Sequence, residues 1–191
     1  MIAVIKYNGG NIGSIANALK RLNTYFEITD NIDIIEKADK VIFPGVGEAS
    51  SAMAYLNDRG LSEVIKHLKK PTLGICLGMQ LMCTYSEENQ TQCMGIFDTN
   101  IKMFPSSQKV PHIGWNNLFE TKGSLFNGIQ ESDVYFVHSY YAEISNFTVA
   151  KCDYIFEFSA ALQKDNFYAV QFHPEKSANY GASILNKFLE L

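Results

Sequence analysis

Short apolar runs alternate with segments of helical periodicity through the first half of the chain, and this alternation constrains the fold most. The expected strands cover residues 2–7, 25–29, 40–43 and 71–75, and the expected helices cover residues 11–21, 50–55, 61–69 and 79–83. These strands are almost continuously apolar, which is typical of parallel strands buried on both faces of a sheet. We therefore predict an α/β fold with a mostly parallel central sheet and helices on both faces.

The second half of the chain changes character. Short β-rich pieces occur at residues 95–97, 101–103, 134–137, 147–149 and 168–172, and a closing helix is expected over residues 177–189. These pieces predict a mixed or antiparallel extension of the sheet. Because no repeat, low-complexity segment or linker interrupts the sequence, we predict one domain over residues 1–191.

Composition and charge exclude several classes of protein. A net charge of -4 gives no electrostatic reason to expect nucleic acid or an anionic membrane as a partner. No run approaches the roughly 20 apolar residues that span a bilayer, and the first residues lack the features of a signal peptide. The four cysteines are too sparse for a disulfide scaffold and have no metal-ligand spacing. We therefore expect a cytoplasmic protein without a metal or cofactor.

A cysteine lies in a tight frame of small residues, Gly74-Ile75-Cys76-Leu77-Gly78. The frame follows an expected strand and precedes an expected helix, which is the pattern of a nucleophile elbow with sulfur in place of the serine oxygen. Flanking glycines permit the strained turn, and the start of the helix favours the thiolate. Cys76 is thus a candidate nucleophile.

Two further candidates follow the last expected strand. His173 and Glu175 are separated by one proline, so the carboxylate can reach round to the imidazole and fix its tautomer. A distant cysteine with this pair supplies a nucleophile, a base and a residue that orients the base.

The carboxyl ends of parallel strands are where open α/β sheets place their sites. One such end carries Pro44-Gly45-Val46-Gly47, whose glycines permit an N–H group to point into the site. Together with the N–H of Leu77, the Gly45–Val46 turn would form an oxyanion hole. The glycines also permit this turn to flip, which leaves room for a hole that is unformed at rest.

Polar residues on the helix after Cys76 extend the candidate site. Gln80 shares a helical face with Cys76, and Glu87 and Glu88 are expected at the end of that helix. The helix dipole disfavours a carboxylate there. A substrate ammonium group would explain these acids, and so would ordinary solvated charge.

Residues 74–80 and 171–175 closely resemble the catalytic segments of the triad-type, or class I, glutamine amidotransferases. The resemblance runs from Met1 to the last helix. Within that family, the glutaminase subunits of imidazole glycerol phosphate synthases are most similar, through residues 8–11, 44–48, 109–116 and 135–140.

The resemblance implies the roles of the candidate residues. Cys76 would attack the side-chain amide of glutamine, and His173, held by Glu175, would protonate the departing ammonia. The substrate's amino-acid end would be held by Gln80, Glu88 and the backbone of Ser139 and Tyr140.

The resemblance also implies a partner. Ammonia would pass to a cyclase subunit, a (β/α)8 barrel, within a heterodimer that serves histidine synthesis. The residues expected at the interface are Asn8, Asn11, Lys109, His112, Trp115 and Asn116. Trp115 is the single tryptophan, a residue type enriched at interface centres, although a place in the core is its ordinary alternative.

Other functions stay open on the sequence alone. A thiol hydrolase shares the elbow, although hydrolases of that fold place the acid before the histidine. A related glutaminase could supply ammonia to a different acceptor, and a non-catalytic binding subunit could keep the fold, although no triad residue is lost. A metal protein fits least, because the four histidines show no ligand spacing.

Overall fold

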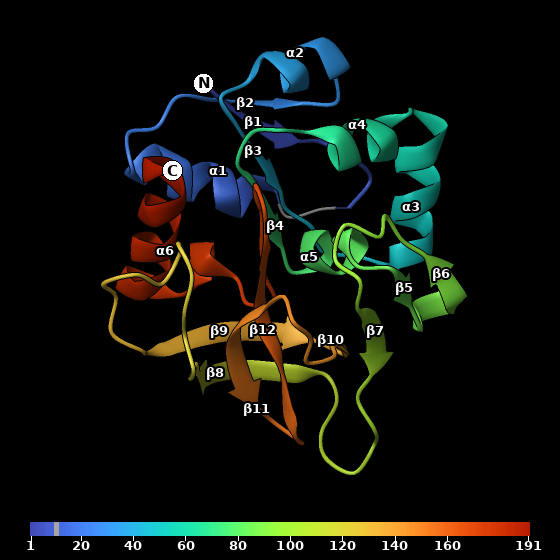
Figure 1. The fold of residues 1–191 in the computed structure, drawn as a ribbon, viewed down its shortest axis with the longest axis vertical. Coiled ribbons are helices and arrows are strands. Elements are labelled where there is room, and N and C mark those ends of the chain that lie inside the picture. The colour runs from blue at the N-terminus through green and yellow to red at the C-terminus, as the bar shows by residue number, and fades with distance from the viewer. Residues whose placement is uncertain (10–11) are drawn as a thin grey trace.

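Parallel strands form the centre of the sheet in a computed structural model, which describes residues 1–9 and 12–191 (Figure 1). The order across this region is β2-β1-β3-β4-β13, and every neighbouring pair is parallel. The strands are β1 (Ile2–Ile5), β2 (Phe26–Thr29), β3 (Lys40–Phe43), β4 (Thr72–Ile75) and β13 (Phe167–Val170). Their side chains are mostly buried on both faces, as the apolar runs predict.

Helices cover both faces of these strands. Figure 1 shows α1 and α6 on one side and α3 and α4 on the other, and the buried side chains divide into two clusters in the same way. The α-helices are α1 (Ile12–Arg21), α2 (Ile32–Lys37), α3 (Ala49–Asp58), α4 (Leu61–His67), α5 (Leu77–Met82) and α6 (Ala178–Glu190). Two short 3-10 helices are η1 (Glu88–Gln90) and η2 (Pro174–Lys176).

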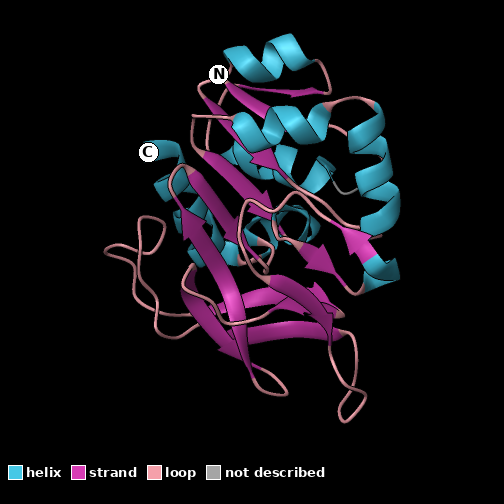
Figure 2. Cartoon of the chain, turned by 45° about the vertical axis from the view of Figure 1, so that its right-hand side comes forward, coloured by secondary structure: helices cyan, strands magenta, loops and turns pink. Residues whose placement is uncertain are grey.

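Beyond β13 the sheet continues mainly with antiparallel strands. The order is β13-β12-β10-β7-β5-β6, with β11 paired to β12. These strands are β12 (Glu157–Lys164), β10 (Tyr140–Ala142), β7 (Asn100–Met103), β5 (Tyr85–Ser86), β6 (Thr91–Gln92) and β11 (Thr148–Asp153). A separate antiparallel pair joins β8 (His112–Asn117) to β9 (Asp133–His138), and Figure 2 shows this lower region of strands joined by loops. The predicted fold class is confirmed.

Some expected boundaries are wrong. Residues 95–97 form no strand, because Gly95 has a φ of 70°, outside the extended region. The last strand ends at Val170 rather than at residue 172. The helix after the elbow begins at Leu77 and ends at Met82, so Cys83 lies just past its end rather than on it.

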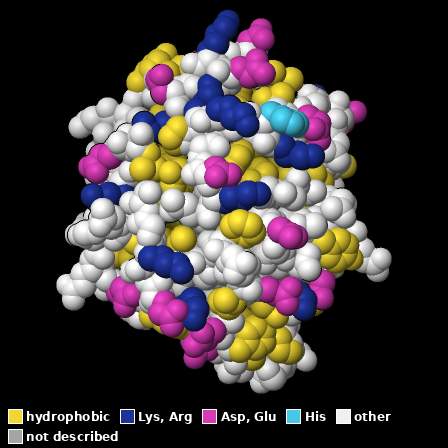
Figure 3. All heavy atoms as spheres, in the orientation of Figure 1, with side chains coloured by type: hydrophobic (Ala, Val, Ile, Leu, Met, Phe, Trp, Pro, Cys, Tyr) yellow, Lys and Arg dark blue, Asp and Glu magenta, His cyan; other side chains and the backbone are white. Residues whose placement is uncertain are grey.

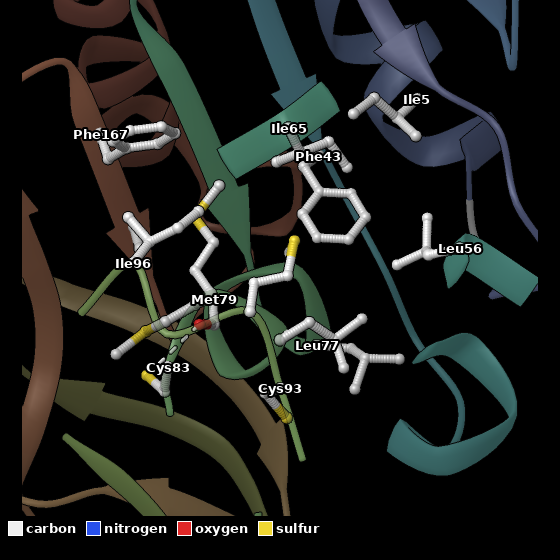
Figure 4. Close-up of a cluster of buried hydrophobic side chains, with 14 of the residues drawn as sticks. Ile5, Phe43, Leu56, Ile65, Leu77, Met79, Cys83, Cys93, Ile96 and Phe167 are labelled. Carbon is white, nitrogen blue, oxygen red and sulfur yellow. Dashed lines mark hydrogen bonds between the residues drawn. The ribbon is translucent and has the colours of Figure 1, made fainter. Parts of the chain in front are cut away.

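Apolar packing fixes the helix that follows the elbow. Figure 4 shows Leu77 and Met79 of α5 within a buried cluster that also contains Phe43 of β3 and Ile96. Leu77 and Met79 are at most 2% exposed. Because these side chains are anchored in the core, the first turn of α5 is held firmly against the sheet.

Charged side chains are spread over the surface. On the face drawn in Figure 3, acidic and basic groups are interspersed, with apolar side chains between them. Among the helices that the structure describes, none is long and apolar enough to cross a membrane.

Candidate active site

Cys76 occupies a sharp turn between β4 and α5. Its backbone has φ 52° and ψ -108°, a conformation that L-residues rarely adopt and that is often retained at functional sites. Only a glycine fits two positions later, because a Cβ at Gly78 would overlap the carbonyl oxygen of Phe43. The sequence pattern of strand, turn and helix is therefore realised, with the sulfur at the carboxyl end of β4.

His173 and Glu175 form an ion pair beside this turn. The distance between His173 Nδ1 and Glu175 Oε1 is 2.8 Å, and the two side chains are only 2% and 4% exposed. Since β13 is the parallel neighbour of β4, the segment that follows it brings the pair to the carboxyl edge of the sheet.

The charges around His173 hold its proton. Burial lowers the pKa of His173, but hydrogen bonding to Cys76 and Glu175, together with the negative charges of the thiolate and the carboxylate, raises it more, to about 10. The imidazole is therefore protonated at neutral pH when the sulfur is a thiolate. His173 can give that proton to a leaving group.

Several buried polar atoms at this edge have no hydrogen-bond partner within the described part of the chain. They are His173 Nε2, Glu175 Oε2 and the hydroxyl of Tyr7, and the remaining such atom is the hydroxyl of Tyr180. Unpaired buried groups cost stability and call for an explanation. Here His173 Nε2 is the ring nitrogen that Glu175 leaves available for proton transfer.

Tyr7 lies against the turn that was expected to complete the oxyanion hole. Its ring packs on Phe43 with centroids 5.3 Å apart, and a Cβ at Gly45 would overlap its hydroxyl oxygen. Burial and the charge of Cys76 both raise the pKa of Tyr7, so the hydroxyl stays protonated and is a potential donor.

The two expected oxyanion donors are not both available in this conformation. The N–H of Leu77 donates to the carbonyl oxygen of Gly45 over 3.3 Å. That carbonyl therefore occupies one donor of the expected hole. In this conformation the N–H of Leu77 is therefore not free to bind an oxyanion.

A pocket of about 300 Å³ opens over Cys76. The residues expected there that do line it are Val46, Leu77, Gln80, Glu88, Ser139 and Tyr140. The carboxyl ends of β3, β4 and β9 and the short helix η1 thus lie around the sulfur of Cys76. The lining also includes Pro111, Val137 and His138, to which the sequence had given no role in the site.

Glu88 lines the pocket, but its expected position at the end of the helix after Cys76 is wrong. It lies in η1, after β5, rather than at the end of α5, and its Oε2 accepts a hydrogen bond of 2.7 Å from the N–H of Ala49. Ala49 is the first residue of α3, where the helix dipole favours a carboxylate. Burial raises the pKa of Glu88, the Ala49 N–H opposes this, and nearby Glu48 adds to the rise.

Gln80 and Gln171 connect the pocket wall to the sulfur. Gln80 Nε2 donates to the carbonyl oxygen of Tyr140 over 3.1 Å and to Gln171 Oε1 over 2.9 Å. Gln171 Nε2 in turn lies 3.6 Å from Cys76 Sγ. Both N–H groups of Gln80 are thus used within the protein, so its amide nitrogen orients the site rather than the substrate.

The sequence offered a signal for Gln171. It is a polar residue directly after the buried strand β13 and two residues before His173, and such a residue needs internal partners. No comparable signal marked Tyr7, whose hydroxyl matters only through its place beneath Gly45.

The residues expected at a partner interface have different environments. Trp115 is 54% exposed, which excludes its alternative place in the core, and Lys109 is exposed as well. Asn8 donates from Nδ2 to the Ser51 carbonyl over 3.1 Å. Asn11 lies outside the described residues.

His112 differs from the expectation. Its side chain is only 3% exposed, so the ring cannot face a partner directly. The alternation of β8 turns His112 inward while its neighbours Ile113 and Trp115 face outward.

The other cysteines are ordinary buried thiols. Cys83, Cys93 and Cys152 are free, and burial raises their pKa values, to about 12 for Cys93 and Cys152. Across residues 1–9 and 12–191, no group of His, Cys, Asp and Glu side chains is arranged to hold a metal ion.

Comparisons with known proteins agree with this geometry. The family model "Glutamine amidotransferase class-I" matches residues 3–191. A Bacteroides fragilis protein, "Imidazole glycerol phosphate synthase subunit HisH", is 56% identical over 194 residues, covering 100% of this chain and 99% of the relative. A protein of the same name from Bacteroides thetaiotaomicron is 54% identical over 194 residues, with the same coverage.

A solved structure extends the likeness to the fold. A crystal structure of a glutamine amidotransferase superposes with a TM-score of 0.79 at 16% identity, covering 100% of this chain and 98% of the other.

Proposed function

The chain belongs to the class-I glutamine amidotransferases, and on that basis we propose that it is the glutaminase subunit of an imidazole glycerol phosphate synthase. The enzyme hydrolyses L-glutamine to L-glutamate and ammonia. The observation that carries this proposal is the elbow cysteine beside the buried His173–Glu175 pair, under a pocket large enough for an amino acid.

In the first step, the Cys76 thiolate attacks the side-chain amide carbon of glutamine, and the carbonyl electrons move to oxygen. The oxyanion needs donors, each of which lowers the barrier by roughly 3–4 kcal/mol. A flip of the Gly45–Val46 peptide would release the N–H of Leu77 and turn the N–H of Val46 into the site. The closed turn is then the resting state, and its opening switches on turnover.

In the second step, the oxyanion electrons re-form the carbonyl, the C–N bond breaks, and His173 gives its proton to the leaving nitrogen, which departs as ammonia and leaves a thioester on Cys76. His173 already carries this proton before the attack, because its pKa is raised beside the Cys76 thiolate. Glu175 holds Nδ1 and stabilises the imidazolium. In the third step, His173 takes a proton from water, whose oxygen attacks the thioester and yields glutamate and the Cys76 thiolate.

The far end of the pocket fits the amino-acid end of glutamine. Glu88 is the acid there, and an ammonium group would supply the counter-charge that this partly buried carboxylate lacks. The backbone of Ser139 and Tyr140 lines the same pocket and would bind the rest of the amino-acid end.

The ammonia acceptor is a cyclase subunit with a (β/α)8 barrel, in a heterodimer with this chain. The name of the Bacteroides relatives supports a synthase with more than one subunit. Ammonia released into water would be wasted, so glutamine hydrolysis should depend on the partner subunit. Opening of the closed Gly45–Val46 turn is the step that the partner would control. The product enters histidine synthesis, and a cytoplasmic location fits four free cysteines.

The test is glutamate release by the purified chain, with and without the cyclase subunit and its nucleotide substrate, with Cys76→Ala as the blank. Strong stimulation by the pair, absent in the variant, supports the proposal. Cys76-dependent release that ignores this cyclase would assign the glutaminase to another acceptor. No release in any mixture would leave a thiol hydrolase or a binding subunit.

Exposed aromatic residues allow the partner face to be tested separately. Trp115→Ala should weaken binding of the cyclase subunit in a titration, because Trp115 lies on the outer face of β8. Tyr25→Ala removes an exposed aromatic side chain at the start of the β2 edge and should bind normally. Equal affinities for both variants would exclude Trp115 from the interface.

A further inference from the structure

A line of hydrogen bonds runs behind the pocket from β8 to its wall. Asn116 Nδ2 lies 3.3 Å from His112 Nε2, and His112 Nδ1 lies 3.0 Å from His138 Nε2. His138 Nδ1 lies 2.7 Å from the carbonyl oxygen of Tyr140. The two histidines face each other across the β8–β9 pair.

The chemistry of the two ends fixes the direction of every bond. The Tyr140 carbonyl can only accept, so His138 carries its proton on Nδ1 and accepts at Nε2. His112 must then donate from Nδ1 and accept at Nε2 from the Asn116 amide. That amide is itself oriented, since its Nδ2 donates to the Asp153 carbonyl and its Oδ1 accepts from the N–H of Asn117.

Burial keeps both rings neutral, as this arrangement requires. It lowers the pKa of His112 to about 4. Burial also lowers the pKa of His138 to about 3, because it outweighs the hydrogen bond to the Tyr140 carbonyl, which raises that pKa. At pH 7 each ring therefore has one donor and one acceptor, and both are used.

The Tyr140 carbonyl is the junction between this line and the catalytic sulfur. It accepts from His138 and also from Gln80, whose other N–H reaches Gln171, and Gln171 reaches Cys76. The orientation of the Tyr140 peptide thus depends on donors from two sides.

We propose that Asn116, His112 and His138 are positioning residues that hold the Tyr140 carbonyl, and with it the glutamine pocket, in its working geometry. The inference rests on the proposed function, in which the Ser139–Tyr140 backbone binds the substrate. It makes β8, whose outer face carries the exposed Ile113 and Trp115, part of the support of the pocket.

Ring packing is the competing explanation for His112. Its ring stacks on Tyr154 with centroids 4.0 Å apart and 16° between planes, and on Phe136 at 4.8 Å and 22°. Two substitutions separate the explanations. His112→Phe keeps a stacked ring without the donor, whereas His112→Asn keeps an amide N–H near the place of Nδ1 without the ring.

The first measurement is glutamate release by the complex of the full chain with the cyclase subunit. In His112→Phe, His138 loses its donor and turns toward the pocket, which should raise KM for glutamine about 3- to 10-fold with kcat within about 2-fold. His112→Asn should keep KM near the wild-type value while melting at a lower temperature than His112→Phe. An unchanged KM in His112→Phe, or a larger rise of KM in His112→Asn than in His112→Phe, would overturn the proposal and would show that His112 acts through ring packing.

The second measurement does not depend on activity. ¹⁵N NMR of the histidine rings in the full chain at pH 7 should show His112 and His138 neutral, with the proton on Nδ1. An Nε2–H tautomer or a charged ring at either position would overturn the proposal. If glutamate release fails altogether, the NMR result still shows whether the line of hydrogen bonds exists. The failed release then counts against the proposed function alone.

Discussion

The N–H of Leu77 and the carbonyl oxygen of Gly45 are joined by a hydrogen bond of 3.3 Å beside Cys76. The bond links the residue after the nucleophile to the turn after β3. It occupies a donor that the proposed reaction needs. Opening it is therefore a step that the chemistry must include, and the residues beneath the turn decide how easily that step occurs.

Tyr7 should stabilise the open turn. Its buried hydroxyl lies against Gly45 and has no partner at rest within the described residues, so a flipped Gly45 carbonyl can accept from it. Tyr7→Phe should lower kcat for glutamate release in the complex about 3- to 10-fold, the worth of one hydrogen bond. Its melting temperature should be equal to the wild type or higher, because an unpaired polar group is removed.

Tyr180→Phe is the matched control, since it also removes a buried, unpaired hydroxyl but lies on α6. It should change stability in the same direction and leave kcat unchanged. A wild-type kcat in Tyr7→Phe would show that the hydroxyl does not act on the turn.

Glu88 should determine the affinity for glutamine rather than the rate of the chemistry. Glu88→Gln removes the charge that we propose faces the substrate ammonium group, and it should raise KM about 10- to 100-fold with a smaller change in kcat. Glu87→Gln is the control, because Glu87 binds the N–H of Met103 instead. Steady-state kinetics in which both variants behave alike would contradict a direct contact of Glu88 with the substrate.

Two glycines should respond to alanine in opposite ways. Gly78→Ala forces a Cβ against the backbone oxygen of Phe43, and we expect it to lower the free energy of unfolding by about 1–3 kcal/mol. Gly13 lies in α1 with open space around it, so Gly13→Ala should raise the free energy of unfolding by up to about 1 kcal/mol. Denaturant titration measures both, and a neutral Gly78→Ala would mean that the elbow can widen.

Two buried histidines should make the protein less stable as the pH falls below 6.5. His112 and His138 have pKa values of about 4 and about 3 when folded, below the value of 6.5 of a free side chain, so the unfolded chain binds their protons first. Stability should therefore fall as pH drops from 6.5, by about 1.4 kcal/mol per pH unit for each ring. The raised pKa of His173 acts above pH 6.5, outside this window.

Urea titrations at pH 7.0, 6.0 and 5.0 test this expectation, with His112→Phe as the comparison. The variant has one ring fewer to protonate and should lose stability less steeply. Equal slopes for the two proteins would show that His112 is not buried as a neutral ring.

The parallel half of the fold could be predicted well from the sequence, because each strand there is a run of apolar residues that must be buried on both faces of a sheet. Prediction was weaker in the second half. The strand β12 contains Ser159, Ala160 and Ala161, small residues with little β preference, and its pairing with β13 and β11 decides its structure. Helix α2 was also missed, although Asn31 caps it by accepting from the N–H groups of Asp33 and Ile34.

The candidate site divides in the same way. Cys76, His173 and Glu175 could be found because their chemistry is written in short motifs with fixed spacing. The direction of Glu88 could not, since it depends on η1 meeting the start of α3. The link from His112 to Tyr140 also escaped, because it needs the register of β8 against β9.

Among the cysteines, Cys76 alone lines the pocket of the candidate site, and this allows competent enzyme molecules to be counted. Cys83, Cys93 and Cys152 are buried thiols with raised pKa values, so an electrophilic glutamine analogue such as a chloroketone should alkylate each chain once, at Cys76. The moles of reagent consumed would then equal the moles of competent enzyme in a preparation. Mass spectrometry of the labelled chain would give the fraction of molecules that are labelled once. Dividing a measured rate by that amount of enzyme would give the turnover number.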